Sequence, residues 1–107
     1  MTVTTEELEE GLGQAAHLLK ALSNKRRLHI MCALKLGEKN VGELEEIVDL
    51  SQSALSQHLA RLRRDGIVVT RRDAQTIYYS MNDKATEKVL ECLCSVFAPD
   101  GFDEDSL

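Results

Sequence analysis

The sequence lacks the features that would assign it to several common classes of protein. It has no apolar run long enough to cross a membrane, and no signal peptide precedes its first predicted helix. It also has no glycine-rich phosphate loop and no evident catalytic triad, so we expect neither an enzyme nor a cofactor. Internal repeats are absent. A chain of 107 residues is therefore expected to form one cytoplasmic domain.

Proline and cysteine are scarce. The single proline, Pro99, is predicted to end the ordered part, giving a domain over residues 1–99 and a mobile acidic tail over residues 100–107. The three cysteines, Cys32, Cys92 and Cys94, are expected to be thiols in a reducing compartment. A monomer of this size buries only a modest core, which makes an oligomer plausible.

Basic residues are outnumbered, and the net charge of −5 at first argues against nucleic acid as a partner. Their distribution changes this interpretation. Between Ser51 and Arg72 the sequence has five arginines and one acid, Asp65, which gives that segment a net charge of +4. A local basic patch on an acidic body still attracts the phosphate backbone, and the flanking acids restrict which surface can dock.

The segment from Val41 to Ser80 carries the most informative pattern. A short helix is predicted over residues 41–48, followed by a polar break and a second helix over Gln52–Arg64 that ends at Asp65-Gly66. Two β-rich runs follow, over residues 67–71 and 76–80, joined by residues 72–75. This order is typical of a winged helix-turn-helix, whose second helix enters the DNA major groove.

Three further helices are predicted around that segment. The first begins at Thr4 or Thr5 and runs to about Leu22, and the second covers roughly residues 25–36. The last begins at Asn82 or Asp83 and runs to about Phe97. The expected fold is thus mainly α with a β-hairpin wing, in the order of four helices, two strands and a fifth helix.

The helix over residues 52–64 has the chemistry expected of a DNA-reading helix. Ser51 is a good N-cap, and an apolar stripe of Ala54, Leu55, Leu59 and Leu62 is predicted to be buried. Short polar side chains near a helix N-terminus can hydrogen-bond to base edges or phosphates. The residues expected to contact double-stranded DNA are Ser51, Gln52, Ser53, Ser56, Gln57, Arg61, Arg64, Arg71, Arg72 and Gln75.

Two alternatives to DNA binding remain. Any solvated helix can show a polar face of this kind. The acidic balance would also suit a protein-interaction module that uses the helix-turn-helix without DNA.

The last predicted helix has an apolar stripe that one small domain would not readily cover. This stripe predicts a homodimer interface, with the first helix contributing as well. The residues expected there are Leu8, Leu12, Val89, Leu90, Leu93, Val96 and Phe97. The alternative is that the last helix packs back onto its own domain.

Four segments, over residues 18–28, 41–44, 50–59 and 71–80, resemble the ArsR/SmtB family of bacterial winged-helix repressors. The resemblance covers residues 15–97. It is closest to the branch of sulfide- and persulfide-responsive repressors of the SqrR, BigR and HlyU type, together with NolR-like repressors. It implies a homodimer joined through its first and last helices that binds an inverted-repeat operator. Ligand or redox chemistry in the dimer then weakens DNA binding.

Metal-sensing members of the family carry a Cys-x-Cys or Cys-x-x-Cys group on the third helix, whereas residues 42–49 here contain neither cysteine nor histidine. Others use Asp and His on the last helix, where this chain has Asp83, Glu87 and Glu91 but no histidine. His17, among apolar residues, is expected to be packed or solvated. We therefore expect no metal site.

The sulfide-responsive relatives pair a cysteine on the second helix with one on the last. Cys32 matches the first position, whereas the second lies just after the terminal aromatic residue, which here is Ala98. Cys94 lies one turn earlier on the same face, so it is preferred to Cys92 as the partner. The resemblance thus implies a pair that reacts with sulfane sulfur or an oxidant. Alternatives are a regulator without thiol sensing, with Cys32 as a core residue, and a soft-metal or arsenite sensor.

Overall fold

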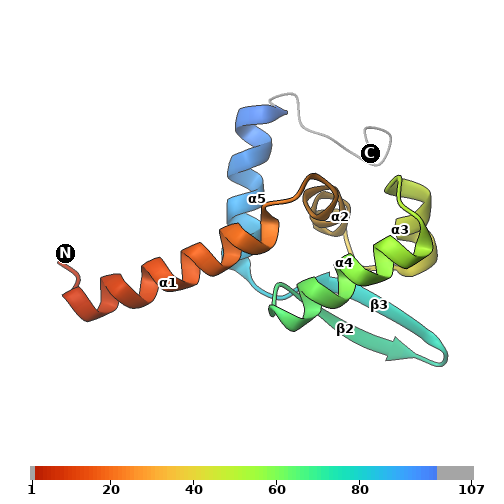
Figure 1. Ribbon diagram of the computed structural model, residues 1–107, viewed down its shortest axis with the longest axis horizontal. Coiled ribbons are helices and arrows are strands. Elements are labelled where there is room, and N and C mark those ends of the chain that lie inside the picture. The colour runs from red at the N-terminus through yellow and green to blue at the C-terminus, as the bar shows by residue number, and fades with distance from the viewer. Residues whose placement is uncertain (1, 99–107) are drawn as a thin grey trace.

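The computed structural model describes residues 2–98 and has the fold of a winged helix-turn-helix (Figure 1). The predicted tail over residues 100–107 lies outside the described residues. None of the helices within residues 2–98 is both long and apolar enough to cross a membrane. The elements are, in order, α1 (Thr5–Leu22), α2 (Lys25–Lys35), β1 (Lys39–Asn40), α3 (Val41–Ile47), α4 (Gln52–Arg64), β2 (Val68–Asp73), β3 (Thr76–Met81) and α5 (Lys84–Phe97).

Each helix begins at a polar side chain that accepts a hydrogen bond from a backbone N–H of the first turn. The predicted caps Thr4, Ser51 and Asp83 are confirmed, because their side chains accept from the backbone of Glu7, Ala54 and Thr86. Such caps satisfy donors that have no partner inside the helix, which is why these helix starts are well defined. At the other end of α4, Gly66 has a φ of 75°, a left-handed conformation that ends the helix.

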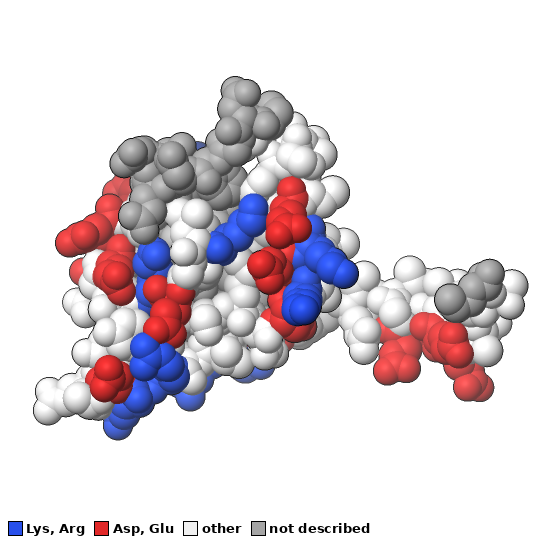
Figure 2. All heavy atoms as spheres, turned by 180° about the vertical axis from the view of Figure 1, so that it is seen from behind, with Lys and Arg blue, Asp and Glu red and all other residues white. Residues whose placement is uncertain are grey.

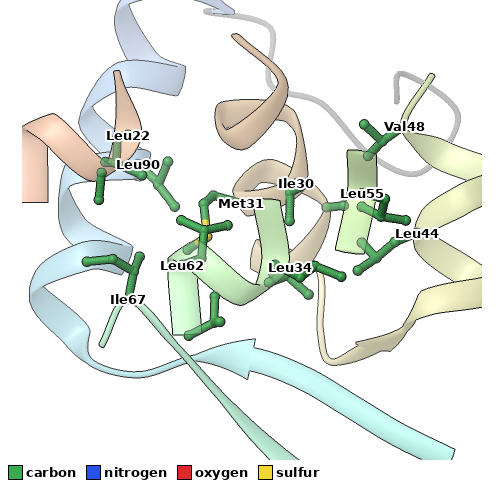
Figure 3. Packing of buried hydrophobic residues seen from close by; sticks show 14 residues of the cluster. Leu22, Ile30, Met31, Leu34, Leu44, Val48, Leu55, Leu62, Ile67 and Leu90 are labelled. Carbon is green, nitrogen blue, oxygen red and sulfur yellow. The ribbon is translucent and has the colours of Figure 1, made fainter. Parts of the chain in front are cut away.

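One hydrophobic core joins the helices to the start of the sheet (Figure 3). The predicted stripe of α4 is confirmed at Leu55, Leu59 and Leu62, which are fully buried, whereas Ala54 is only half-buried. In α2, Ile30, Met31 and Ala33 are fully buried. Helix α2 is covered on several sides by α1, α3, α4, α5 and β3, so its apolar residues do not follow one narrow stripe.

The sheet contains a strand that the sequence analysis missed. Strand order is β1-β3-β2, all antiparallel, with Lys39 opposite Tyr79 and Asn40 opposite Tyr78. A two-residue strand made of lysine and asparagine has no local strand signal, so only its pairing with β3 reveals it. The expected order of elements is therefore corrected: β1 lies between α2 and α3.

The wing, formed by β2 and β3, is longer than predicted. Residues 72 and 73, expected in the loop, belong to β2, whereas Ile67 precedes the strand. Asp73 pairs with Thr76, which leaves a two-residue turn at Ala74-Gln75, with a φ of 57° at Ala74. The tip of the wing is largely exposed, so no burial pattern marks where its strands end.

Candidate nucleic-acid interface and thiol pair

The outward side of α4 is open to solvent along its first two turns. Its polar residues Gln52, Ser53, Ser56 and Gln57 are all exposed, while the opposite side packs into the core. We call these four residues the reading face. The helix contains no acidic residue, and the predicted contact Arg64 is also exposed. The helix therefore presents hydrogen-bonding groups without a carboxylate that would repel phosphate.

The C-terminal end of α4 is held by contacts from distant segments. The Asp65 backbone oxygen lies 2.7 Å from Nε2 of His17 in α1. The Gly66 backbone oxygen accepts a hydrogen bond of 2.8 Å from the side chain of Asn82, just before α5. His17, expected to be packed or solvated, is exposed and bonded to this turn. The sequence analysis missed both contacts because no local pattern connects residues so far apart.

The predicted arginine contacts differ in what they touch. Arg61 forms an ion pair with Asp65 across one helical turn, with Nε 3.4 Å from the carboxylate. Arg71 forms a bidentate pair with Glu38, and its guanidinium lies 4.5 Å from the centroid of the Tyr78 ring. Hydrogen bonding within this pair lowers the pKa of Glu38 and raises that of Arg71.

Arg72 differs from its neighbour Arg71. Consecutive strand residues point to opposite faces of a sheet, and cross-strand pairing places Arg71 opposite Tyr78 but Arg72 opposite Ile77. Arg72 and Gln75 are exposed, and Arg72 has no ion pair among the described residues. Figure 2 shows basic side chains next to acidic ones near the wing, and acidic side chains along the projecting part of α1.

Two of the three cysteines share one pocket of about 260 Å³, which we call the thiol pocket. It is lined by Leu28, Cys32, Leu90, Leu93, Cys94, Phe97 and Ala98. Burial, followed by the charge and hydrogen bonding of Cys94, raises the pKa of Cys32 to about 11. Cys92 is exposed and lies outside this pocket. The structure therefore brings Cys32 together with Cys94, the preferred partner, and not with Cys92.

The residues expected at a dimer interface fall into two groups. Leu90 is buried in the core of its own chain, and Val89 and Leu93 pack partly against that core. The expectation that Leu90 belongs to an interface is therefore corrected. The remaining residues, Leu8, Leu12, Val96 and Phe97, are between 51% and 79% exposed. The N-terminal half of α1 projects away from the body (Figure 1), so its apolar residues have no cover from the described chain.

Residues that could hold a metal ion do not gather in the described part of the chain. Within residues 2–98, no group of three or more His, Cys, Asp or Glu side chains has the arrangement needed for a metal ion. Among the residues that line the thiol pocket, only Cys32 and Cys94 have side chains that commonly bind metal ions. Two thiols alone do not complete the four-coordinate shell of a structural zinc site.

Comparison with known proteins identifies the family. Residues 24–70 match the bacterial regulatory proteins described as the arsR family. The chain is 50% identical over 88 residues to the transcriptional activator HlyU of Vibrio cholerae, covering 82% of both proteins. It is 48% identical over 94 residues to the nodulation protein NolR of Rhizobium meliloti, covering 88% of this chain and 77% of NolR.

A solved structure supports the same assignment. The crystal structure of the transcriptional repressor BigR from Xylella fastidiosa matches with a TM-score of 0.80 and 39% identity, covering 89% of this chain and 97% of BigR. The exposed reading face and the hairpin wing fit the DNA-binding role of this fold. The chain thus belongs to the arsR family of bacterial regulatory proteins and is a DNA-binding transcriptional regulator, not an enzyme.

Proposed function

We propose that this regulator is a homodimeric repressor that binds an operator inverted repeat and is released when Cys32 and Cys94 become bridged. The observation that carries the proposal is the thiol pocket, in which a thiol from α2 and a thiol from α5 lie together among apolar side chains. Packing of the core alone does not require a second thiol beside Cys32. A bacterial repressor that binds operator DNA acts in the cytoplasm, where its thiols start reduced.

The proposed chemistry uses a sulfane-sulfur compound of the type R–S–SH. The Cys94 thiolate attacks the outer sulfur, forms Cys94–S–SH and releases R–SH. The Cys32 thiolate then attacks Sγ of Cys94, which forms the disulfide and releases H₂S. The two thiols lose two electrons, and the donor is reduced to R–SH and H₂S. Because its pKa is raised, Cys32 is mostly protonated at neutral pH, so the first attack is assigned to Cys94, and the small thiolate fraction of Cys32 limits the rate of the second step.

The location of the pair suggests how bridging would reach the DNA. Cys32 lies on α2, which packs against α4 and β3, and Cys94 lies on α5 near the exposed residues Val96 and Phe97. A covalent link would change how α5 sits on α2. If α1 and α5 join the two subunits, this change alters the separation of the two reading helices, which must match the operator half-sites.

The proposed DNA contacts are the reading face together with Ser51, Arg64, Arg72 and Gln75. The other two expected contacts, Arg61 and Arg71, are paired with carboxylates in the free protein. The proposed dimer interface uses Leu8 and Leu12 of α1 and Val96 and Phe97 of α5. Four exposed large apolar side chains favour association, because a partner subunit would remove them from water. Leu12→Glu should therefore yield monomers in light scattering, whereas Lys20→Glu on the same helix should leave dimers.

Gel-shift titration before and after treatment with an organic persulfide tests the thiol proposal. Operator affinity should fall on treatment of the wild-type protein and return with dithiothreitol. Cys32→Ser and Cys94→Ser should abolish the response without changing reduced affinity, and Cys92→Ser is the matched control that should respond like the wild type.

A rescue variant makes the test sharper. Ala98, the residue that directly follows α5, lines the same pocket as Cys94. The double variant Cys94→Ser, Ala98→Cys should therefore regain a response that the single variant has lost. An unchanged operator affinity of treated wild-type protein, with the disulfide confirmed by mass spectrometry, would show that the regulator acts without thiol sensing.

A further inference from the structure

We propose that Glu38 limits sequence-independent DNA binding by holding Arg71 away from phosphate. The two side chains come from segments 33 residues apart and form three hydrogen bonds. Two of these join Nε of Arg71 to Glu38 oxygens at 2.9 and 3.1 Å, and the third comes from the terminal nitrogen. Two-pronged pairing of this kind holds a guanidinium in a defined orientation.

The pair crosses the whole sheet. Arg71 lies on β2, and Glu38 directly precedes β1 at the opposite edge, with β3 between them. The guanidinium passes over the ring of Tyr78 on β3 at 4.5 Å from its centroid. The side chain of Arg71 is therefore directed across the sheet surface instead of outward from the wing.

A phosphate could bind the edge of Arg71 formed by Nε and one terminal nitrogen only by displacing the Glu38 carboxylate, which already accepts from both. Hydrogen bonding from Arg71 lowers the pKa of Glu38, which further favours the charged form of that carboxylate. The pair is also neutral overall, so it adds nothing to the attraction of the wing for phosphate. Arg72 has no such partner among the described residues and is available for that contact.

This arrangement sets the overall strength of DNA binding. Phosphate contacts strengthen binding to every sequence, whereas base contacts from α4 distinguish one sequence from another. Neutralising one wing arginine thus lowers the affinity for operator and non-operator DNA alike and leaves the reading face unaffected. Glu38 therefore limits the sequence-independent part of the affinity.

Glu38→Gln tests the proposal in fluorescence anisotropy titrations with operator and non-operator duplexes over a range of salt concentrations. The variant should bind operator and non-operator DNA several-fold more tightly by similar factors, and the slope of log affinity against log salt should steepen by about 0.9 per subunit. Glu38→Gln combined with Arg71→Ala should lose both effects. Glu46→Gln, which removes one exposed acid from α3, is the matched charge control and should change the slope less.

Arg71→Gln provides a second, independent test. Because Arg71 is already neutralised, this variant should change non-operator affinity much less than Arg72→Gln does. Equal effects of Glu38→Gln and Glu46→Gln would overturn the proposal, because they would show only a loss of general negative charge. Weaker binding by Glu38→Gln would overturn it too, since Glu38 would then only brace the wing.

Discussion

The Nε2 atom of His17 lies 2.7 Å from the backbone oxygen of Asp65, and this contact joins α1 to the C-terminal end of α4 across 48 residues. Carbonyl groups in the last turn of a helix have no partner within the helix. Since a carbonyl oxygen only accepts hydrogen bonds, Nε2 must donate here. With the bond from Asn82 to Gly66, the end of α4 is fixed by α1 itself and by the segment that leads into α5, the two proposed dimer helices.

Replacing His17 with alanine should destabilise the protein by about 1 kcal/mol, the usual net contribution of one hydrogen bond. Urea denaturation followed by circular dichroism measures this change. His17→Gln should retain part of the stability, because its side-chain amide can donate from a similar position. Gln14→Ala, one turn earlier on α1, is the control. A loss as large in that control would mean that the helix, and not the contact with Asp65, is responsible.

The thiol of Cys32 should react slowly at neutral pH. Burial and the neighbouring Cys94 raise its pKa from an ordinary 9.0 to about 11, which lowers the thiolate fraction roughly a hundredfold. Alkylation by iodoacetamide, resolved by peptide mass spectrometry, should therefore accelerate up to about pH 11 at Cys32.

The same shift has a consequence for stability. Because the folded pKa is raised, the stabilisation it contributes is complete below pH 9 and declines as the pH rises towards 11. The slow alkylation should persist in Cys94→Ser, since burial is the larger cause. Rapid alkylation of Cys32 at pH 7 would contradict both expectations.

Gln57 is expected to read a base. Gln57→Ala should cost roughly 1–3 kcal/mol on the operator and less on DNA altered at the contacted position. Anisotropy titrations at one fixed salt concentration measure both values. A loss of equal size on every sequence would show instead that Gln57 only positions the helix on the backbone.

Arg72 is expected to contact phosphate or the minor groove. Arg72→Ala should weaken binding to operator and non-operator DNA to a similar extent and reduce the salt slope by about 0.9 per subunit. The comparison needs several salt concentrations for each duplex. An effect confined to the operator would identify Arg72 as a base-reading residue.

The turn of the wing contains a strained residue. Ala74 has a φ of 57°, a conformation in which a side chain is unfavourable and glycine is not. Ala74→Gly should therefore stabilise the protein by about 0.5–1 kcal/mol, measured by thermal denaturation. Gln75→Gly, at the next position, lacks a positive φ to relieve and should be destabilising or neutral. A stabilising effect there would exclude backbone strain as the reason.

The parts of the fold that could be predicted from the sequence depend on local chemistry. The caps Thr4, Ser51 and Asp83 form bonds within three residues, so the helix starts were predicted correctly. The strand β1 could not be predicted, because Lys39 and Asn40 become a strand only by pairing with Tyr79 and Tyr78. Contacts between residues close in the sequence can be predicted from the local residue types, whereas contacts between distant segments cannot.

The candidate site shows the same division. The exposure of Gln57 and its neighbours followed from helical periodicity, since the buried stripe determines the opposite face. Periodicity also placed Leu90 in the apolar stripe of the last helix but could not tell which surface would cover that stripe, and Leu90 lies in the chain's own core. Likewise, alternation along β2 separates Arg71 from Arg72, whereas nothing near Arg71 in the sequence indicates Glu38 as its partner.

Strand β1 also connects the helix that carries Cys32 with the wing that is proposed to contact DNA. It follows α2, the helix that carries Cys32, after a short connection, and it is fastened to the wing through β3. A small rotation of α2 would therefore move the wing, even with α4 stationary. Each subunit would then lose part of its hold on DNA by itself, before any change in the distance between subunits.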